Sequence, residues 1–358
     1  MHGLLTSPSR IHRRQDSDVT PRVSVCVPTY NGAAFLGETL ASISAQTFDD
    51  FEALIVDDCS TDDTLDLAER FARSDSRMRV IRNAERAGSG AANANNCLGH
   101  ARGEWLKFLA QDDVMAPTCL ERMLEASARG PLVICWHDYR FEPGIDPALH
   151  TWRMGGNRPL AVELPGGYAD ADTLCGAILR RPYSNFIGPT SSCLIHRDCF
   201  AKYGSFDPSF SFFPDLDYWT RVGSREGVAI ATEYLVTFRV HDGSISGGIR
   251  RDPRRDFREG LQRLRRALRF VRSPDLENLR RIAAASSPPI DLEARARALA
   301  VEVRWAAVDD SYRRRDRWAL DQWEAIVAAD PYVRELVKEA DAALPLSTRV
   351  KQFIKRRL

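Results

Sequence analysis

Between residues 22 and 141, short apolar runs alternate with segments whose apolar residues recur every three or four positions. The apolar runs predict strands at 23–30, 52–58, 78–83, 104–113 and 132–141. The helical spacing predicts helices at 33–46, 64–74 and 117–129, and the small residues of 85–96 are interpreted as a loop. Repeated strand–helix units of this length predict an α/β fold, with a mostly parallel sheet flanked by helices.

The pattern changes twice in the rest of the chain. Residues 142–190 are aperiodic and rich in Pro and Gly, and loops of this length usually carry function. Strands are predicted at 188–200 and 233–246, around a helix at 215–226. From residue 250 the chain is Arg-rich and helical, with one apolar stripe made by Phe257, Leu261, Leu264, Leu268 and Val271. Further helices are expected at 292–308 and 316–329. The predicted organisation is a disordered lead-in at 1–20, a sheet domain at 21–249 and a C-terminal α-helical extension at 250–358.

Pairs of aspartates follow two of the predicted strands. Asp57-Asp58 ends the second apolar run and Asp112-Asp113 ends the fourth. Because ligands of open α/β sheets bind outside the carboxyl ends of the parallel strands, these carboxylates are expected in one crevice. A hard divalent cation, Mn²⁺ or Mg²⁺, with a diphosphate-bearing ligand would relieve their mutual repulsion. Capping of the following helix is the alternative for Asp57-Asp58.

Composition narrows the function classes. The chain has 358 residues and a net charge of +1, which gives no reason to expect nucleic acid as a partner. Neither a membrane-spanning run nor an apolar signal core is found, and the scattered cysteines suggest neither zinc nor disulfides, so a cytoplasmic location is expected. Residues 347–358 are basic and amphipathic, which predicts peripheral contact with the inner face of the membrane. A terminal helix docked on its own domain is the alternative.

Five segments in this order resemble family 2 glycosyltransferases, and together the likeness covers residues 22–247. They are 23–64, 101–114, 188–210, 214–222 and 238–246. The resemblance implies a GT-A (Rossmann-like) fold and inverting transfer of a sugar from a nucleoside diphosphate, with Mn²⁺ or Mg²⁺. A UDP-sugar donor, a glycan or lipid-linked acceptor, and a place in cell-surface polysaccharide or glycoconjugate assembly are the expectations that follow.

The resemblance also assigns residues. The nucleotide side is implied to include Pro28, Thr29, Tyr30, Asn31, Asn95 and Gln111, with Asp58 accepting the N–H of the base. Asp112 is assigned to the ribose or the metal, Asp113 to the metal, and His241 to the diphosphate or metal. Asp215 matches the catalytic base, although it could instead be only a helix N-cap, and Asp217 follows two residues later.

The chain departs from the family pattern at three positions. Ala110 replaces the first aspartate of the Asp-x-Asp region, Ala94 stands where an Arg is usual, and Pro214 replaces a Glu. Two other functions remain open. A catalytically silent sugar-nucleotide or glycan binder would leave Asp215 idle. A sugar-1-phosphate nucleotidyltransferase would need a Gly-rich, Arg- or Lys-bearing loop after the first strand, and Pro-Thr-Tyr-Asn-Gly is different.

Overall fold

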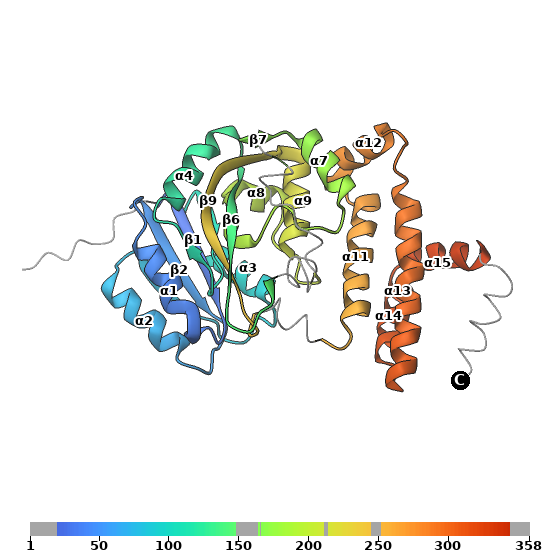
Figure 1. Cartoon of the computed structure of the whole chain (residues 1–358), viewed down its shortest axis with the longest axis horizontal. Coiled ribbons are helices and arrows are strands. Elements are labelled where there is room, and N and C mark those ends of the chain that lie inside the picture. Colours follow the sequence, from blue (N-terminus) through green and yellow to red (C-terminus); the bar gives the residue numbers. More distant parts are fainter. Residues whose placement is uncertain (1–19, 148–163, 165, 211–213, 245–251, 344–358) are drawn as a thin grey trace, which may run out of the picture.

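A single nine-stranded sheet forms the centre of the N-terminal domain in the computed structural model (Figure 1). The structure describes residues 20–147, 164, 166–210, 214–244 and 252–343. The order along the sheet is β3-β2-β1-β4-β8-β6-β9-β5, and β7 pairs with β9. The strands are β1 (Val23–Thr29), β2 (Phe51–Asp57), β3 (Met78–Arg82), β4 (Trp105–Phe108), β5 (Val114–Met115), β6 (Leu132–Phe141), β7 (Tyr168–Ala169), β8 (Cys193–His196) and β9 (Val228–Val240).

The four strands β3-β2-β1-β4 run parallel to one another, so the ends of β1, β2 and β4 face the same edge. Beyond β4 the sheet is mixed. β8 pairs antiparallel with β4 and with β6, while β6 and β9 pair in parallel, with an irregular register around Trp136. The expected α/β fold with parallel strands is thus confirmed, and the antiparallel strands are confined to the second half.

Helices cover both faces of the sheet because its strands alternate apolar side chains between them. Val25 and Val27 of β1 pack in one core beneath α1, α2 and α4, while Cys26 joins the other core beneath α3 and α7–α9. The helices of the domain are α1 (Ala33–Ser44), α2 (Thr64–Ser74), α3 (Gly90–His100), α4 (Cys119–Ala126), α7 (Ala171–Arg180), α8 (Arg197–Tyr203) and α9 (Pro214–Glu226). Short 3₁₀ turns are η1 (Ser127–Arg129) and η2 (Thr190–Ser192).

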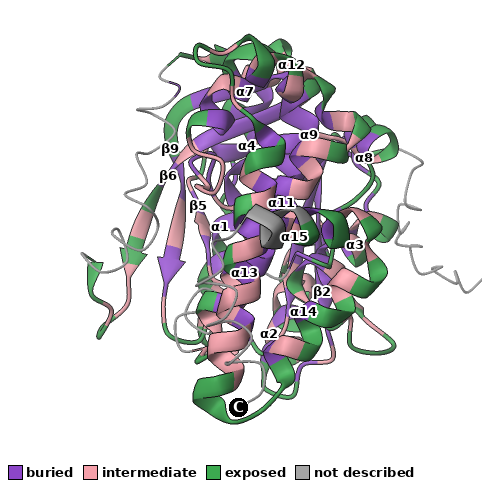
Figure 2. Ribbon diagram, turned by 90° about the vertical axis from the view of Figure 1, so that its right-hand side faces the viewer, coloured by how far each residue is buried: buried purple, intermediate pink, exposed green. Residues whose placement is uncertain are grey.

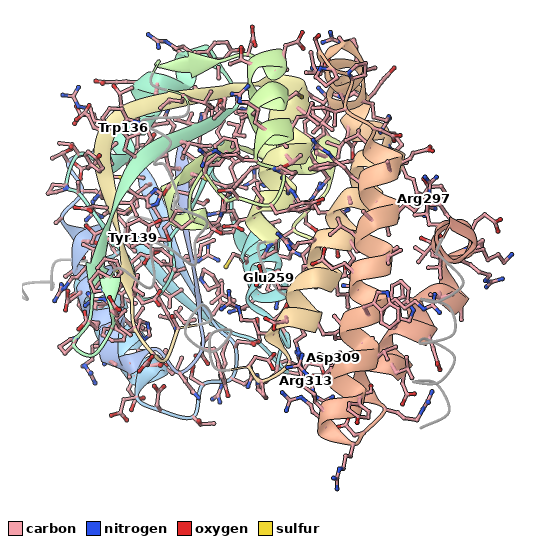
Figure 3. The ribbon with its side chains drawn as sticks, turned by 45° about the vertical axis from the view of Figure 1, so that its right-hand side comes forward. Trp136, Tyr139, Glu259, Arg297, Asp309 and Arg313 are labelled. Carbon is pink, nitrogen blue, oxygen red and sulfur yellow. The ribbon has the colours of Figure 1, made fainter. Side chains whose placement is uncertain are left out.

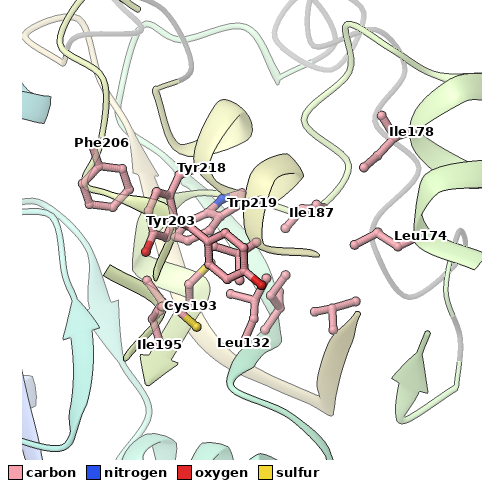
Figure 4. Close-up of a cluster of buried hydrophobic side chains, with 14 of the residues drawn as sticks. Leu132, Leu174, Ile178, Ile187, Cys193, Ile195, Tyr203, Phe206, Tyr218 and Trp219 are labelled. Atoms are coloured by element: carbon pink, nitrogen blue, oxygen red, sulfur yellow. The ribbon is translucent and has the colours of Figure 1, made fainter. Parts of the chain in front are cut away.

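The largest buried side chains of the second core belong to α9. Tyr218 and Trp219 are fully buried and lie against residues of β6 and β8 such as Leu132 and Cys193 (Figure 4). Burying aromatic side chains of this size stabilises a helix strongly, at about 1.5–3 kcal/mol for a large apolar side chain. The orientation of α9 on the sheet is therefore fixed by its own sequence.

Two loop predictions were wrong. Helix α3 begins at Gly90, inside the expected loop 85–96, because Ser89 caps it by accepting a hydrogen bond from the amide of Ala92. Helix α7 occupies part of the aperiodic stretch 142–190, and Asp170 caps it in the same way by accepting from the amide of Thr173. In both cases the cap outweighs the unfavourable composition of the segment.

The C-terminal extension is a helical layer, with α11 between α9 and α13 (Figures 1 and 3). Its elements are α11 (Arg255–Arg272), η3 (Pro274–Leu276), α12 (Glu277–Ala285), α13 (Leu292–Arg314), α14 (Trp318–Ala329) and α15 (Pro331–Ala343). The predicted apolar stripe of α11 is confirmed: Phe257, Leu261 and Leu264 are buried against α13, as the buried faces in Figure 2 also show.

Several predictions concern residues that the structure leaves undescribed. The lead-in lies almost wholly outside the described residues, as does the basic segment 347–358, and the expected domain boundary at 249–250 falls in another such stretch. Among the helices that are described, none is long and apolar enough to cross a membrane.

Candidate active site

The turn that follows β1 is held from both sides at the edge where the parallel strands end. The side-chain amide of Gln111 accepts a hydrogen bond from the amide of Tyr30 (2.8 Å) and donates to its carbonyl (3.1 Å). Asn31 has a positive φ of 48°, donates its amide to the Ser60 hydroxyl, and accepts from the amide of Thr61. The turn of Pro28, Thr29, Tyr30 and Asn31 is therefore preorganised beside the turn that follows β2.

Space beside Gly32 is filled by the Gln111 amide. A Cβ at position 32 would lie only 2.3 Å from Oε1 of Gln111, so a larger residue would have to shift the amide that orders Tyr30. Gln111 thus acts here by ordering the turn, and its contact with a nucleotide stays a prediction.

Asp58 lies at the end of β2 and collects hydrogen bonds on one of its oxygens. Oδ1 accepts from the amide of Ala87 (2.6 Å) and from the side chain of Asn83 (2.8 Å). Oδ2 is 3.7 Å from Nε of Arg86. The Arg86 guanidinium also lies over the ring of Tyr30, 3.5 Å from its centroid. A fixed carboxylate next to an aromatic ring and a cation is suited to bind a planar base that carries N–H donors.

The capping alternative for Asp57-Asp58 is not supported. Helix α2 starts at Thr64, and Asp62 rather than either of the two residues bonds the Thr64 amide and hydroxyl. Asp57 is fully buried and accepts from the amide of Ser60 (3.1 Å), which shapes the turn itself. Asp57 therefore has a structural role and Asp58 presents the carboxylate.

Two asparagines of α3 have different roles. Asn93 is buried, donates to the carbonyls of Thr29 and Val56, and accepts from Asn83, so it joins the ends of β1 and β2 to the Asp58 network. Asn95 instead bonds the amide and carbonyl of Phe206 with both of its polar atoms. The expected contact of Asn95 with the nucleotide disagrees with this geometry, because its amide is already occupied.

The turn after β4 brings Asp112 and His241 together. Oδ2 of Asp112 and Nε2 of His241 are 2.9 Å apart, and both side chains are partly exposed, at 17% and 15%. Arg239 of β9 fixes the turn by donating from Nε to the carbonyl of Asp112 (3.0 Å). The same guanidinium is ion-paired with Glu38 and Glu142. This pair can offer one carboxylate and one imidazole to a divalent cation.

Asp113 differs from its neighbour. Its side chain is fully buried, Oδ1 accepts from the amide of Arg239 (3.0 Å), and Oδ2 accepts from the hydroxyl of Ser191 (2.5 Å). Burial, followed by the charge of Asp112, raises the pKa of Asp113 well above its usual range. Both oxygens of Asp113 are bonded inside the protein, a geometry that favours a supporting role, and its assignment to the metal stays a prediction.

Asp215 lies in the first turn of α9. Oδ1 accepts from the amide of Leu216 (2.8 Å), and Oδ2 is within 3.3 Å of the Asn185 amide nitrogen and 3.5 Å of the Thr190 hydroxyl. Burial raises the pKa of Asp215 from 3.8 to about 6, although these hydrogen bonds act in the opposite direction. Such a pKa is suitable for a general base at neutral pH.

Asp215 is connected to the Asp112-Asp113 turn through two adjacent residues of η2. Thr190 contacts Asp215, and Ser191 donates to Asp113 and accepts from the amide of Ala110. The predicted cation side and the predicted base are therefore joined through η2, although they are about a hundred residues apart in sequence.

Asp217 faces away from this crevice. Its carboxylate accepts from Nε of Arg221 (3.0 Å) and from Arg269 of α11. Arg221 also donates to the carbonyl of Ser205. Arg269 also donates to the carboxylate of Asp207. Asp217 is thus a structural ion-pair centre, which leaves Asp215 as the acidic residue of α9 available for proton transfer.

Sequence reasoning missed several of these residues. Arg86, Asn185, Thr190 and Arg239 all contact the predicted site. Arg86 and Asn185 lie outside the five resembling segments, while Thr190 and Arg239 lie inside two of them but were assigned no role. Arg239 had one usable signal, since an arginine two residues before His241 lies on the same β9 strand end. Within the described residues, no three His, Cys, Asp or Glu side chains converge as a metal site would require.

Solved structures with this arrangement share the GT-A glycosyltransferase fold. S. aureus TarS 1–349 in complex with UDP-GlcNAc superposes with a TM-score of 0.53 at 17% identity, over 82% of this chain and 92% of that one. The mannosyltransferase PcManGT from Pyrobaculum calidifontis, in complex with GDP-Man and Mn²⁺, superposes with a TM-score of 0.51 at 18% identity, over 95% and 85%. The sheet domain therefore has the GT-A fold.

The sequence profile of glycosyl transferase family 2 matches residues 24–186. This stretch, less than half of the chain, is similar to glycosyltransferase family 2. The putative glycosyltransferase EpsH of Bacillus subtilis (strain 168) is 40% identical over 124 residues, which are 34% of this chain and 36% of the relative. The GalNAc(5)-diNAcBac-PP-undecaprenol beta-1,3-glucosyltransferase of Campylobacter jejuni is 33% identical over 110 residues, 31% of this chain and 36% of the relative. The matched segments thus span little more than a third of these relatives.

Proposed function

We propose that this protein is an inverting, metal-dependent glycosyltransferase that moves a sugar from a nucleoside-diphosphate sugar to an acceptor hydroxyl. The observation that carries the proposal is Asp215: a buried carboxylate with a pKa of about 6, joined through η2 to the Asp112 turn. Glycosyl transfer to a hydroxyl needs a base that takes the proton of the acceptor and a positive charge that stabilises the leaving diphosphate.

The geometry around Asp58 supports the nucleoside part of the donor. Oδ1 of Asp58 is fixed by Asn83 and the Ala87 amide, so the carboxylate cannot rotate freely. A ring N–H of uracil would form a charge-assisted hydrogen bond with such a carboxylate. The stacked pair of Tyr30 and Arg86 would lie beside the base or the ribose.

Asp112 and His241 fit a divalent cation, with Asp113 supporting the turn behind them. One carboxylate and one imidazole leave several coordination positions for phosphate oxygens and water, as Mn²⁺ and Mg²⁺ prefer. When bound, such a cation would supply positive charge to the diphosphate of the donor. Asp113 is excluded as a ligand in this proposal because its oxygens bond Ser191 and Arg239.

The reaction itself depends on Asp215. Its carboxylate takes the proton of the acceptor hydroxyl as that oxygen attacks the anomeric carbon. A new C–O bond forms on one face of the sugar while the bond to the diphosphate breaks on the other, and the electron pair leaves with the nucleoside diphosphate. Attack from the opposite face inverts the anomeric configuration. Asn185 and Thr190 orient the base for this step.

We propose a UDP-sugar as the donor. We propose a glycan or a lipid-linked molecule as the acceptor, and a role for the reaction in cell-surface polysaccharide or glycoconjugate assembly. The structural neighbours support a nucleotide-sugar donor, since they were solved with UDP-GlcNAc and GDP-Man. The Campylobacter relative is named as acting on an undecaprenol-linked glycan, and a Bacillus relative is named for teichuronic acid biosynthesis. Both names support a cell-surface product.

The test has two stages. First, UDP, GDP and their sugars are screened by thermal shift with and without Mn²⁺, since a ligand that binds the folded state raises the melting temperature by mass action. Second, the best donor is incubated with the enzyme, and release of nucleoside diphosphate is measured with and without acceptor glycans. Stabilisation without any release would indicate a silent binder. Formation of pyrophosphate from a sugar 1-phosphate and a nucleoside triphosphate would indicate a nucleotidyltransferase instead.

A further inference from the structure

The C-terminal extension reaches the proposed catalytic helix through one buried arginine. Arg266 of α11 is 5% exposed, and its guanidinium donates to three acceptors of the sheet domain. Nη1 donates to the carbonyl of Leu216 (3.0 Å), Nη2 to the hydroxyl of Thr220 (2.8 Å), and Nε to the carbonyl of Pro182 (2.6 Å). One side chain of α11 thus joins the first turn of α9 to the segment that begins at Pro182.

These are the two elements that surround Asp215. Asn185, three residues after Pro182, donates to Oδ2 of Asp215. Leu216, whose carbonyl receives Arg266, donates its amide to Oδ1 of the same carboxylate. Arg266 therefore fixes the separation between the base and its partners, because a planar guanidinium holds its acceptors at set distances and angles.

The charge of Arg266 has a second consequence. All three of its hydrogen bonds go to neutral oxygens, so the buried cation has no direct carboxylate partner. Burial lowers the pKa of Arg266 to about 10, and the negative charges of Asp217 and Asp215 oppose that change. By the same interaction, Arg266 favours the ionised form of Asp215. Cys193 of β8 is the other titratable group that interacts with Asp215, and burial raises its pKa so that it stays uncharged.

A neighbouring ion-pair network also holds α11 against α9. Arg269, one turn further along, contacts Asp217 and Asp207. Arg221 bonds the same Asp217. Arg266 interacts electrostatically with both Asp217 and Asp215, and it differs from Arg269 in that its hydrogen bonds reach the elements on either side of Asp215.

We propose that Arg266 is a positioning residue for the general base, which makes the helical extension part of the catalytic machinery. It orients the first turn of α9 and the segment that carries Asn185, and it adds a buried positive charge that favours the ionised form of Asp215. The inference rests on the proposed function in so far as Asp215 is the base.

The test compares Arg266→Met, Arg266→Lys and the control Arg272→Met. Arg272 lies on the same helix but is half-exposed and pairs with Asp330 of the extension (2.6 Å). For Arg266→Met we expect kcat to fall about 10–100-fold, since small misplacements of catalytic groups cost up to about 10². The KM for donor should change by less than roughly threefold, because the donor contacts are untouched. Arg272→Met should retain the parent kcat.

The pH dependence of kcat distinguishes a role of Arg266 in positioning Asp215 from a role in the stability of the fold alone. Without the positive charge, Asp215 protonates more readily, so the acid limb of kcat should move to higher pH in Arg266→Met. Arg266→Lys keeps the positive charge but loses the planar guanidinium that bonds three acceptors. Its kcat should therefore lie between those of the parent and Arg266→Met, while the acid limb of its pH profile should stay near that of the parent. An unchanged acid limb, with activity lost only in proportion to folded protein, would refute the proposal. If Arg266→Met does not fold, Arg266→Gln is compared with Arg266→Lys in the same way.

A readout without turnover distinguishes this inference from the proposed function. Titration of ¹³C-labelled aspartates by NMR, with Asp215→Asn used for assignment, gives the pKa of Asp215 directly. A higher pKa in Arg266→Met supports the coupling even if the parent enzyme transfers no sugar, which would overturn only the proposed function. An equal pKa in parent and variant overturns the role of Arg266.

Discussion

Asp215→Asn and Asp217→Asn should change stability in opposite directions, although the two residues are neighbours in one helical turn. Burial raises the pKa of Asp215 from 3.8 to about 6, so the folded protein holds the proton more tightly than the unfolded chain. This contribution to stability is fully present below pH about 4 and is lost as the pH rises through about 6. At pH 8 the buried carboxylate of Asp215 therefore destabilises the fold by about 3 kcal/mol. This follows from the rise in its pKa from 3.8 to about 6, because a difference of one pKa unit corresponds to about 1.36 kcal/mol.

Asn at position 215 removes that penalty, so Asp215→Asn should raise the free energy of unfolding at pH 8 by up to about 3 kcal/mol. It should also lower turnover by about 10²–10⁴-fold, because an amide cannot take the acceptor proton. Asp217 is 3% exposed and bonded to Arg221 and Arg269. Breaking a buried ion pair costs about 3–5 kcal/mol, and the lower end applies here because both arginines keep other acceptors.

Urea unfolding at pH 8 and pH 5, combined with a donor-release assay, measures both effects. The stabilisation by Asp215→Asn should shrink at pH 5, where the parent carboxylate is largely protonated, while the cost of Asp217→Asn should persist. A stability difference between the parent and Asp215→Asn that does not depend on pH would refute the reasoning. Loss of turnover in folded Asp217→Asn, with near-normal turnover in Asp215→Asn, would exchange the two catalytic assignments.

Four further predictions concern the metal, the donor and the pH. Asp112→Asn and His241→Ala should each weaken Mn²⁺-dependent binding of nucleoside diphosphate at least roughly tenfold, or about 1.4 kcal/mol, by calorimetry. Asp113→Asn should instead leave the Mn²⁺ affinity of the folded protein unchanged; a loss of Mn²⁺ affinity equal to that of Asp112→Asn would restore Asp113 as a ligand. Asp58→Asn should weaken nucleoside diphosphate binding by about 1.5–3 kcal/mol, the range for hydrogen bonds to charged groups, while nucleotide-independent Mn²⁺ binding stays constant. The kcat/KM of the parent should fall below pH about 6, where Asp215 protonates, and an acid limb absent in that region would count against it as the base.

The parallel half of the fold could be predicted because its signals are local. Apolar runs fix β1, β2 and β4, and their polar ends place Asp58 and Asp112 at one edge of the sheet. The roles within each aspartate pair were harder to assign. Asp57, Asp58 and Asp113 are all buried, and of the four carboxylates only that of Asp112 is partly exposed. The members of each pair differ in their hydrogen-bond partners, which come from distant segments and which only the structure shows.

Residues that act through long-range contacts left no comparable signal. Asn93 and Asn95 lie two positions apart in one small-residue segment, yet Asn93 joins two strand ends and Asn95 bonds Phe206. The difference depends on which face of α3 each residue occupies, and the helix itself was hidden by a composition typical of loops. A cap at Ser89 decided the local structure, and the packing of α3 on the sheet then decided the roles.

The sequence also offered no way to assign roles to the arginines of α11. In the sequence they form the polar face of an amphipathic helix, and such a face is normally exposed to solvent. Arg266 and Arg269 instead reach carbonyls and carboxylates of α9, because α11 lies between α9 and α13 and has protein on both sides. A buried guanidinium is costly unless its acceptors are fixed, and here those acceptors belong to the helix that carries Asp215. The part of the polar face of α11 that carries Arg266 and Arg269 is thus constrained by the proposed active site, so substitutions of these two residues should affect catalysis, whereas Arg272, which pairs with Asp330, should tolerate change.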